Sequence, residues 1–373
     1  MPEFIQGREL SRLFFEEAVK PILGRVVPDL GYGAGLIGSG SEVLGFDDEM
    51  SADHHWGPRV MLFVNERDED ANRKIIDTAM REQLPSTFRG YPTNFSDPDP
   101  NDNNVQRLVA VEGGSINHRV ETFTLRSYLL SYLNFDIDGE IEAADWLTFP
   151  EQKLRTIADG SVFEDAIGLR EVLARFHYYP HDVWLYLLAA GWNRIGQEEH
   201  LMGRAGLAGD EIGAALIASR LVRDIMRLCF LMEKQYAPYP KWFGTAFSGL
   251  GCADRVSPHL EAVLRSASWG EREKHLVPAY EYIAAMHNAL GINEELPAKS
   301  GNFFGRPFKV IELVGGFSDA IRTQITDPEV KRIAEKNLIG SIDQISDNTD
   351  ILSDSKWRGS LRNLYAMTNE GNR

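Results

Sequence analysis

The sequence has little cysteine and few cations for its length, and each shortage excludes a class of protein. Two of its 373 residues are cysteines, which excludes a disulfide scaffold and a cysteine-rich zinc site and predicts a reducing, cytoplasmic setting. Lys and Arg number 39 against 55 Asp and Glu, which gives a formal net charge of −16. Because nucleic-acid affinity comes mainly from cations that neutralise phosphates, we expect no nucleic-acid partner. The sequence also lacks the polybasic cluster that holds proteins to anionic lipid.

The sequence has no long hydrophobic run either. Its longest apolar stretch, residues 183–191, is about half of the ~18 residues that a membrane-spanning helix needs, so no membrane partner is expected. The first residues show no basic region followed by an apolar run, so no signal peptide is expected. Apolar residues nevertheless make up 43 % of the chain, which is enough for large cores, and 373 residues suggest two or three domains.

The first part of the chain mixes helical and strand patterns. Some segments carry apolar residues at three- and four-residue steps, and others are short runs rich in β-branched residues. These patterns predict helices at 8–25 and 68–83, a buried strand at 60–64, and a hairpin of strands 108–111 and 119–125 around the turn at Gly113-Gly114. The Asn-, Asp- and Pro-rich segment 91–104 is predicted to be a loop.

After Pro150 the strand patterns stop and helical periodicity takes over. Helices are predicted at 182–200, 210–236, 279–290 and 327–344. We therefore expect an α+β protein, with a small mixed-sheet domain at residues 1–148 followed by an α-helical bundle domain at residues 149–373. The sequence does not indicate the oligomeric state.

One segment, residues 38–64, combines small residues, acids and histidines just before the predicted strand. Gly40-Ser41 is followed, after 11 residues, by Asp53-His54-His55. Small residues let backbone N–H groups and a serine hydroxyl approach a phosphate closely, and carboxylates two residues apart on an extended segment can hold Mg²⁺. This order resembles the signature of the DNA polymerase β-like nucleotidyltransferase superfamily, in which a Gly-Ser pair precedes an Asp-x-Asp/Glu pair beside a strand.

The resemblance implies that Gly40 and Ser41 bind the nucleotide phosphates and that Asp53 is a catalytic metal ligand. The second carboxylate would fall at position 55, where this sequence has His55. Imidazole is a poor ligand for Mg²⁺ but suits Mn²⁺ or Zn²⁺. Three alternatives follow: another metal, recruitment of an acid at residues 47–49, or nucleotide binding without fast chemistry. A zinc site at the two adjacent histidines is a further alternative, although no third ligand occurs at the spacing of zinc motifs.

Two more residues take roles from this resemblance. Glu121 lies in a setting similar to the Arg-x-Glu-Val-Thr strand of the aminoglycoside adenylyltransferases, which implies that it is a general base or a metal ligand. In two-domain nucleotidyltransferases the helical domain often supplies a cation to the triphosphate. Lys241, which follows a turn stiffened by Pro238 and Pro240, is the candidate for that nucleotide-binding role.

Longer stretches of the chain resemble a narrower family. Residues 38–59, 178–184, 209–211 and 237–247 look like a bacterial domain-of-unknown-function family, DUF4037, which is usually placed among the nucleotidyltransferase-like proteins. The resemblance covers most of residues 5–310. Its motifs are long enough to be specific, and they indicate a family without indicating a substrate.

Together the resemblances imply a metal-dependent nucleotidyltransferase. It would transfer a nucleoside monophosphate from an NTP to a hydroxyl of a small molecule and release pyrophosphate, with Mg²⁺ or Mn²⁺ as cofactor. The expected NTP is ATP, and the expected transferred group is AMP. Asp53 and Glu121 would be catalytic, and Asp53 and His55 would hold the metal. Because acids gather at 47–49, 53 and 121, the acceptor is expected to be neutral or cationic. The alternatives are a nucleotide-binding regulatory protein with a degenerate catalytic site and a protein AMPylator.

Overall fold

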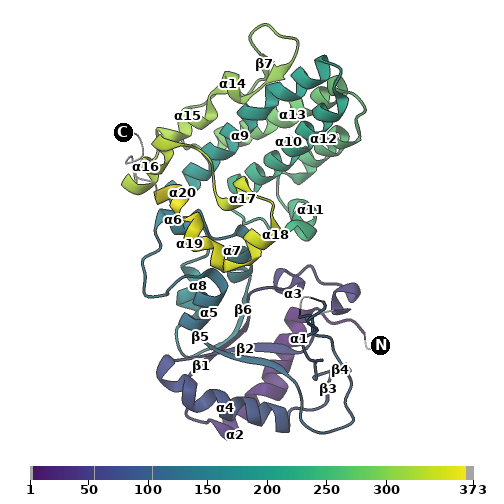
Figure 1. Ribbon diagram of the computed structural model, residues 1–373, viewed down its shortest axis with the longest axis vertical. Helices are drawn as coiled ribbons and strands as arrows, with labels where there is room; N and C mark the ends of the chain where they lie inside the picture. The colour runs from purple at the N-terminus through teal and green to yellow at the C-terminus, as the bar shows by residue number, and fades with distance from the viewer. Residues whose placement is uncertain (1–2, 54, 103, 367–373) are drawn as a thin grey trace. The chain divides into compact units, whose positions relative to one another are not determined.

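The fold is α+β, as predicted. The computed structural model describes residues 3–53, 55–102 and 104–366, with the backbone alone for residues 52 and 53. Figure 1 shows a small sheet whose strands come from the first half of the chain, and long helices that come from the second half. Among the described residues, no helix combines the length and the apolar character needed to span a bilayer.

The chain forms two compact units that alternate along the sequence. A sheet unit comprises residues 1–140 and 153–177, and a helical unit comprises residues 141–152 and 178–373. The predicted domain boundary between residues 148 and 149 falls inside residues 141–152, the first of the two segments that form the helical unit. As a boundary between domains it stays a prediction.

Four strands form the sheet, in the order β5-β2-β1-β6 (Figure 1). β1 (Tyr32–Leu36) pairs antiparallel with β2 (Arg59–Val64) and with β6 (Ser161–Asp165), while β2 pairs in parallel with β5 (Arg119–Thr124). The sheet is therefore mixed, as predicted, and β2 confirms the strand expected at 60–64. Its residues are all buried and, after Arg59, all apolar, as fits a strand that is covered on both faces.

Helices lie on both faces of this sheet, and one face is covered by helices from the N-terminal part of the chain. α1 (Gly7–Phe14), the π-helix η1 (Phe15–Val19) and α2 (Lys20–Val26) follow one another without a break and confirm the helix predicted at 8–25, and α4 (Glu66–Gln83) confirms the one predicted at 68–83. Their apolar stripes form a core with the side chains of Val60, Leu62 and Val120. Figure 1 shows α2 and α4 on this side of the sheet, and α5 (Leu125–Leu133) and α8 (Leu169–Ala174) on the other.

The four-stranded sheet differs from the prediction in three places. Residues 108–111 form an irregular segment in which Leu108 makes a single bridge to Phe95, and β5 pairs with β2 instead. The predicted hairpin is therefore wrong, because the partner of β5 is a strand far away in the sequence. β1 and β6 lie outside the predicted strands, since β1 is rich in glycine and β6 mixes apolar with charged residues. β6 also shows that strands do not stop at Pro150.

The helical unit is built around long helices. α9 (His181–Leu207) and α10 (Glu211–Met232) pack against each other and against α13 (Trp269–Ala289), which packs on α12 (Ala253–Arg265). α9, α10 and α13 confirm the helices predicted at 182–200, 210–236 and 279–290. The helix predicted at 327–344 is interrupted between α16 (Pro328–Lys336) and α17 (Ile342–Ile345), because Gly340 has a positive φ of 83° and Ser341 caps the start of α17.

The remaining helices and strands are short. In the sheet unit they are α3 (Ser41–Leu44), the 3₁₀ helix η2 (Glu49–Asp53), β3 (Thr87–Phe88) and β4 (Tyr91–Pro92). In the helical unit they are α6 (Ala143–Trp146), η3 (Pro240–Trp242), α11 (Phe243–Phe247), β7 (Gly301–Asn302), β8 (Lys309–Val310), α14 (Glu312–Gly315), α15 (Phe317–Arg322), α18 (Thr349–Ser353), η4 (Ser355–Trp357), α19 (Arg358–Leu361) and α20 (Asn363–Ala366). α7 (Glu151–Ala158) runs from the helical unit into the sheet unit.

Candidate functional site

Three segments that carry predicted site residues meet at one end of the sheet. Antiparallel pairing places the end of β1 beside the start of β2, with Gly35 opposite Met61. Parallel pairing places the start of β5 beside the start of β2, with Arg59 opposite Arg119. The loop 38–41 after β1, the segment before β2 and the first residues of β5 therefore lie at the same end.

The face of the sheet opposite α4 carries the charged side chains of these strands. Arg59 pairs in register with Arg119, and Met61 with Glu121. Because side chains alternate along a strand, these four residues point to the same face. The side chain of Glu121 is 41 % exposed, whereas that of Arg119 is 15 % exposed. Glu121 is thus accessible to a ligand, and Arg119 lies deeper beside it.

Arg119 lies between His55 and Glu121. One terminal nitrogen of its guanidinium is 3.3 Å from His55 Nδ1 and 3.1 Å from Gln106 Oε1, and the other is 3.4 Å from Glu121 Oε2. A guanidinium has donors only, so His55 Nδ1 accepts this hydrogen bond. The structure therefore brings His55 and Glu121 to one cation. Sequence reasoning gave that cation no role, although its alternation with Glu121 in the strand was an available signal.

The segment before β2 contains a short helix, and after it His55, a residue with a positive φ. Asp53 is the last residue of η2, and its side chain and the whole of residue 54 lie outside the described part of the chain. The roles of Asp53, and the zinc alternative, therefore stay predictions. His55 has φ 53°, a conformation that His adopts more readily than most residues, and its N–H donates to the Gln106 carbonyl at 2.8 Å.

The Gly-Ser loop after β1 is anchored by an arginine of β2. Arg59 is buried, pairs with Glu42 at 2.7 Å and donates to the Ser39 carbonyl at 2.8 Å. Gly40 has φ 147°, and a Cβ there would lie 2.5 Å from Glu42 Oε2 and 2.7 Å from the Arg59 guanidinium. Glycine at this position therefore permits the ion pair. Ser41 follows directly and begins the short helix α3.

The acids at 47–49 include two with structural hydrogen bonds. Asp47 is buried, and its Oδ2 accepts from the Gly7 N–H at 2.6 Å and from Trp56 Nε1 at 3.0 Å. Asp48 Oδ1 accepts from both the N–H and the hydroxyl of Ser51, at 3.0 and 3.1 Å. Among the side chains that the structure describes, which leaves out those of residues 53 and 54, no three His, Cys, Asp or Glu side chains converge as a metal site.

Lys241, the remaining predicted nucleotide-binding residue, belongs to the helical unit. It lies in η3, its side chain is exposed, and its Nζ is 4.9 Å from the centre of the Trp242 ring. Within the sheet unit, the paired strands bring three other predicted residues to one end of the sheet: Gly40 in its loop, His55 before β2, and Glu121 in β5. The predicted role of Lys241 stays a prediction.

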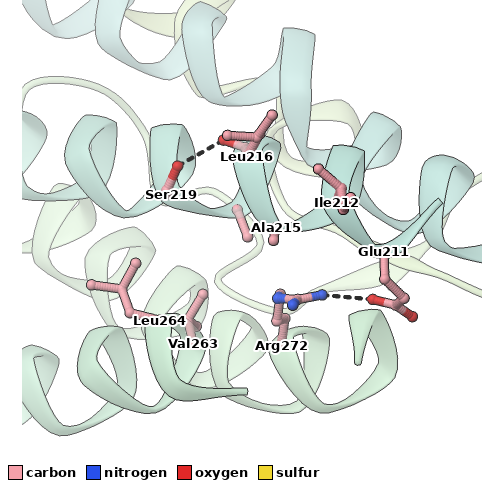
Figure 2. Close-up of a pocket in the computed structure, with 9 residues that line it drawn as sticks. Glu211, Ile212, Ala215, Leu216, Ser219, Val263, Leu264 and Arg272 are labelled. Carbon is pink, nitrogen blue, oxygen red and sulfur yellow. Dashed lines mark hydrogen bonds and ion pairs between the residues drawn. The ribbon is translucent and has the colours of Figure 1, made fainter. Parts of the chain in front are cut away.

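The helical unit also contains a surface pocket of about 520 Å³, shown in Figure 2. Its lining comes from α10, α12 and α13: Glu211, Ile212, Ala215, Leu216, Ala218, Ser219, Val263, Leu264 and Arg272. At one end Arg272 pairs with Glu211 at 2.7 Å (Figure 2). Because this pair neutralises both charges, the pocket presents mainly aliphatic surface to a ligand.

Comparisons with known proteins give partial likenesses. The family model described as a domain of unknown function (DUF4037) matches residues 146–243, which confirms the expected resemblance over that range; the range includes Lys241 and leaves out segment 38–59. No curated protein matches the sequence. The crystal structure of a nucleotidyltransferase-like protein from Exiguobacterium sibiricum 255-15 is similar at 10 % identity and a TM-score of 0.34, over 74 % of this chain and 77 % of that chain.

Proposed function

We propose that this protein binds a nucleoside triphosphate at the end of its sheet and transfers a nucleoside monophosphate to a hydroxyl of a small molecule, with release of pyrophosphate. The observation that carries the proposal is the meeting of three parts of the chain: the Gly-Ser loop after β1, His55 in the segment before β2, and Glu121 in β5. A glycine-containing loop and an accessible carboxylate at the same end of a sheet suit phosphoryl-group chemistry, because that chemistry depends on positioning and charge neutralisation.

Each of these groups has a role that suits its chemistry. The Gly-Ser loop binds phosphate oxygens, because small residues allow the backbone N–H groups to approach them. Glu121 accepts the proton of the acceptor hydroxyl while that oxygen bonds to the α-phosphorus and the bond to the pyrophosphate oxygen breaks. Arg119 holds the Glu121 carboxylate in place through the contact at 3.4 Å.

The donor groups suit one divalent cation. Asp53 is a carboxylate and His55 adds an imidazole, a set that suits Mn²⁺ better than Mg²⁺. A two-ion site needs enough carboxylates to hold both ions, and here a histidine stands at position 55 while Arg119 provides a fixed positive charge beside Glu121. A bound cation neutralises charge on the triphosphate. ATP as donor, AMP as the transferred group and a neutral or cationic acceptor belong to the same proposal.

One observation favours a second candidate function, nucleotide binding without transfer. The Arg119 guanidinium contacts both His55 and Glu121, so a cation of the protein already occupies part of the space between these two side chains. Such a protein would act as a nucleotide-binding regulator. A protein AMPylator would differ from the proposed enzyme only in its acceptor.

Release of pyrophosphate separates the enzyme from the regulator. The full chain is mixed with each NTP, with Mn²⁺ or Mg²⁺, and with a panel of small neutral and cationic hydroxyl compounds. We expect an NTP to raise the melting temperature and Mn²⁺ to support pyrophosphate release. A rise in melting temperature without release supports the regulator, and no rise with any NTP contradicts both candidates. Transfer of label from ATP to a protein in a cell lysate would indicate an AMPylator.

Three substitutions locate the site. Glu121→Gln should keep the NTP-induced rise in melting temperature and lower pyrophosphate release by about 100-fold or more, because it removes the general base. Asp53→Asn should abolish release while the fold is kept. Asp70→Asn is the matched control, since it removes an exposed acid of α4 away from the sheet end. Equal activity of the Asp53 variant and the control would show that the site assignment is wrong.

A further inference from the structure

Two buried donors lie beneath the Gly-Ser loop. Tyr128 of α5 is 4 % exposed, and Arg59 of β2 is 7 % exposed. Within the described part of the chain, the Tyr128 hydroxyl and Arg59 Nε both lack a hydrogen-bond partner. An unpaired buried donor destabilises a protein, so two of them beside one loop require an explanation.

Both side chains reach the turn at residues 38–40. A Cβ on Gly38 would lie 2.8 Å from the Tyr128 hydroxyl oxygen, and a Cβ on Gly40 would lie 2.7 Å from a terminal nitrogen of Arg59. Burial raises the pKa of Tyr128 well above its ordinary value, and the nearby charge of Arg59 opposes that rise. The hydroxyl therefore keeps its proton and is able to donate it in a hydrogen bond.

The Tyr128 ring is held in place by its neighbours. It packs edge-on against Phe63, with ring centres 5.5 Å apart, and stacks on Tyr132 at 5.4 Å. Tyr132 gives a contrast in the same cluster, because its hydroxyl lies 2.7 Å from Thr156 Oγ1 and 3.4 Å from Ser39 Oγ. One tyrosine of the pair thus has hydrogen-bond partners, while the packing of the other fixes its hydroxyl under the turn.

We propose that the Tyr128 hydroxyl and Arg59 Nε donate hydrogen bonds to a phosphate group of the nucleotide. The inference rests on the proposed function and deepens it by adding a phosphate subsite beneath the Gly-Ser loop. Two unpaired donors beside one turn fit a phosphate group, because its anionic oxygens offer lone pairs and carry no proton. Both donors are buried and residues 38–40 lie against both side chains, so the turn shifts when the phosphate enters. Glycine at 38 and at 40 gives the turn that freedom.

The test is Tyr128→Phe, which removes the hydroxyl and keeps the ring. The free variant should melt at the temperature of the wild type or above it, because an unpaired buried donor has been removed. Its Kd for ATP and its Kd for inorganic pyrophosphate, both measured with Mn²⁺, should rise by about 10-fold, which is the loss of one hydrogen bond to a charged group. Binding of adenosine, which has no phosphate, should stay the same as in the wild type.

Tyr132→Phe is the matched control. It removes a hydroxyl that has partners, so the free protein should melt below the wild type. A similar loss in Tyr128→Phe would overturn the inference, because it would mean that the Tyr128 hydroxyl is paired in the free protein. Unchanged Kd values in Tyr128→Phe would overturn the inference alone, provided that the wild type binds ATP. If the wild type binds neither ATP nor pyrophosphate, the proposed function fails and the subsite fails with it.

Discussion

A single methyl group at Gly40 tests how the loop is anchored. At φ 147° and ψ 142° the backbone of Gly40 lies in a region that costs other residues about 1–3 kcal/mol. The new Cβ would also lie 2.5 Å from Glu42 Oε2 and 2.7 Å from the Arg59 guanidinium, so this buried pair has to separate. Breaking a buried pair outright costs about 3–5 kcal/mol. With partial adjustment, we expect Gly40→Ala to destabilise the sheet unit by about 3–6 kcal/mol.

Gly45→Ala is the matched control for this substitution. Gly45 has φ 72° at the end of α3, and a Cβ there would meet no described atom within 4 Å, so only backbone strain of about 1–2 kcal/mol is expected. Hydrogen exchange of the β2 amides measures the stability of the sheet unit separately from that of the helical unit. We expect the opening free energy in β2 to fall by about 1–5 kcal/mol more in Gly40→Ala than in the control. Equal losses would refute the anchoring by Arg59 and Glu42.

Three further predictions concern the metal preference, the pH dependence and the packing. His55→Asp should keep the melting temperature and raise Mg²⁺-supported pyrophosphate release, because Asp tolerates φ 53° and adds a carboxylate; unchanged Mg²⁺ activity would contradict this. Burial raises the pKa of both Glu199 and Glu312 from the ordinary 4.5 to about 7, so the folded state binds more protons between these values. Their contribution to stability is complete below about pH 4.5 and is lost as the pH rises through about 7, so the helical unit should melt lower at about pH 8 than at about pH 5. Gly206→Ala would push a methyl group into the Trp269 ring, and urea unfolding should show a loss of about 1–3 kcal/mol.

Prediction of the fold succeeded where the signal is local. The helices at 8–25 and 68–83 and the strand at 60–64 follow from the spacing of apolar residues within each segment. β1 gives no such signal, because its glycines are required by close contacts with residues that are distant in the sequence. A Cβ on Gly33 would lie 3.0 Å from the Leu169 side chain, and one on Gly35 would lie 2.5 Å from the Ser161 carbonyl oxygen. Only the assembled unit explains why these positions carry no side chain.

For the candidate site, too, the sequence indicated some residues, while others could be recognised only in the folded structure. The motif spacing singled out Gly40 and His55, the resemblance of its strand singled out Glu121, and the strand pairings bring these residues to one end of the sheet. The contact of Arg119 with His55 could not be predicted, because it depends on the parallel register of β5 with β2 and on the path of the chain before β2. The same holds for Tyr128, since the sequence of a helix does not show whether a buried hydroxyl finds a partner.

β6 completes the sheet late in the chain, and this has a consequence for biosynthesis. The strand at 161–165 pairs with β1 after the chain has contributed residues 141–152 to the helical unit. While the protein is being synthesised, one edge of β1 stays unpaired until β6 leaves the ribosome, and open strand edges recruit other chains. A fragment that stops at residue 148 would keep this open edge and should aggregate. An expressed sheet unit therefore has to extend through β6, at least to residue 165, to pair this edge of β1.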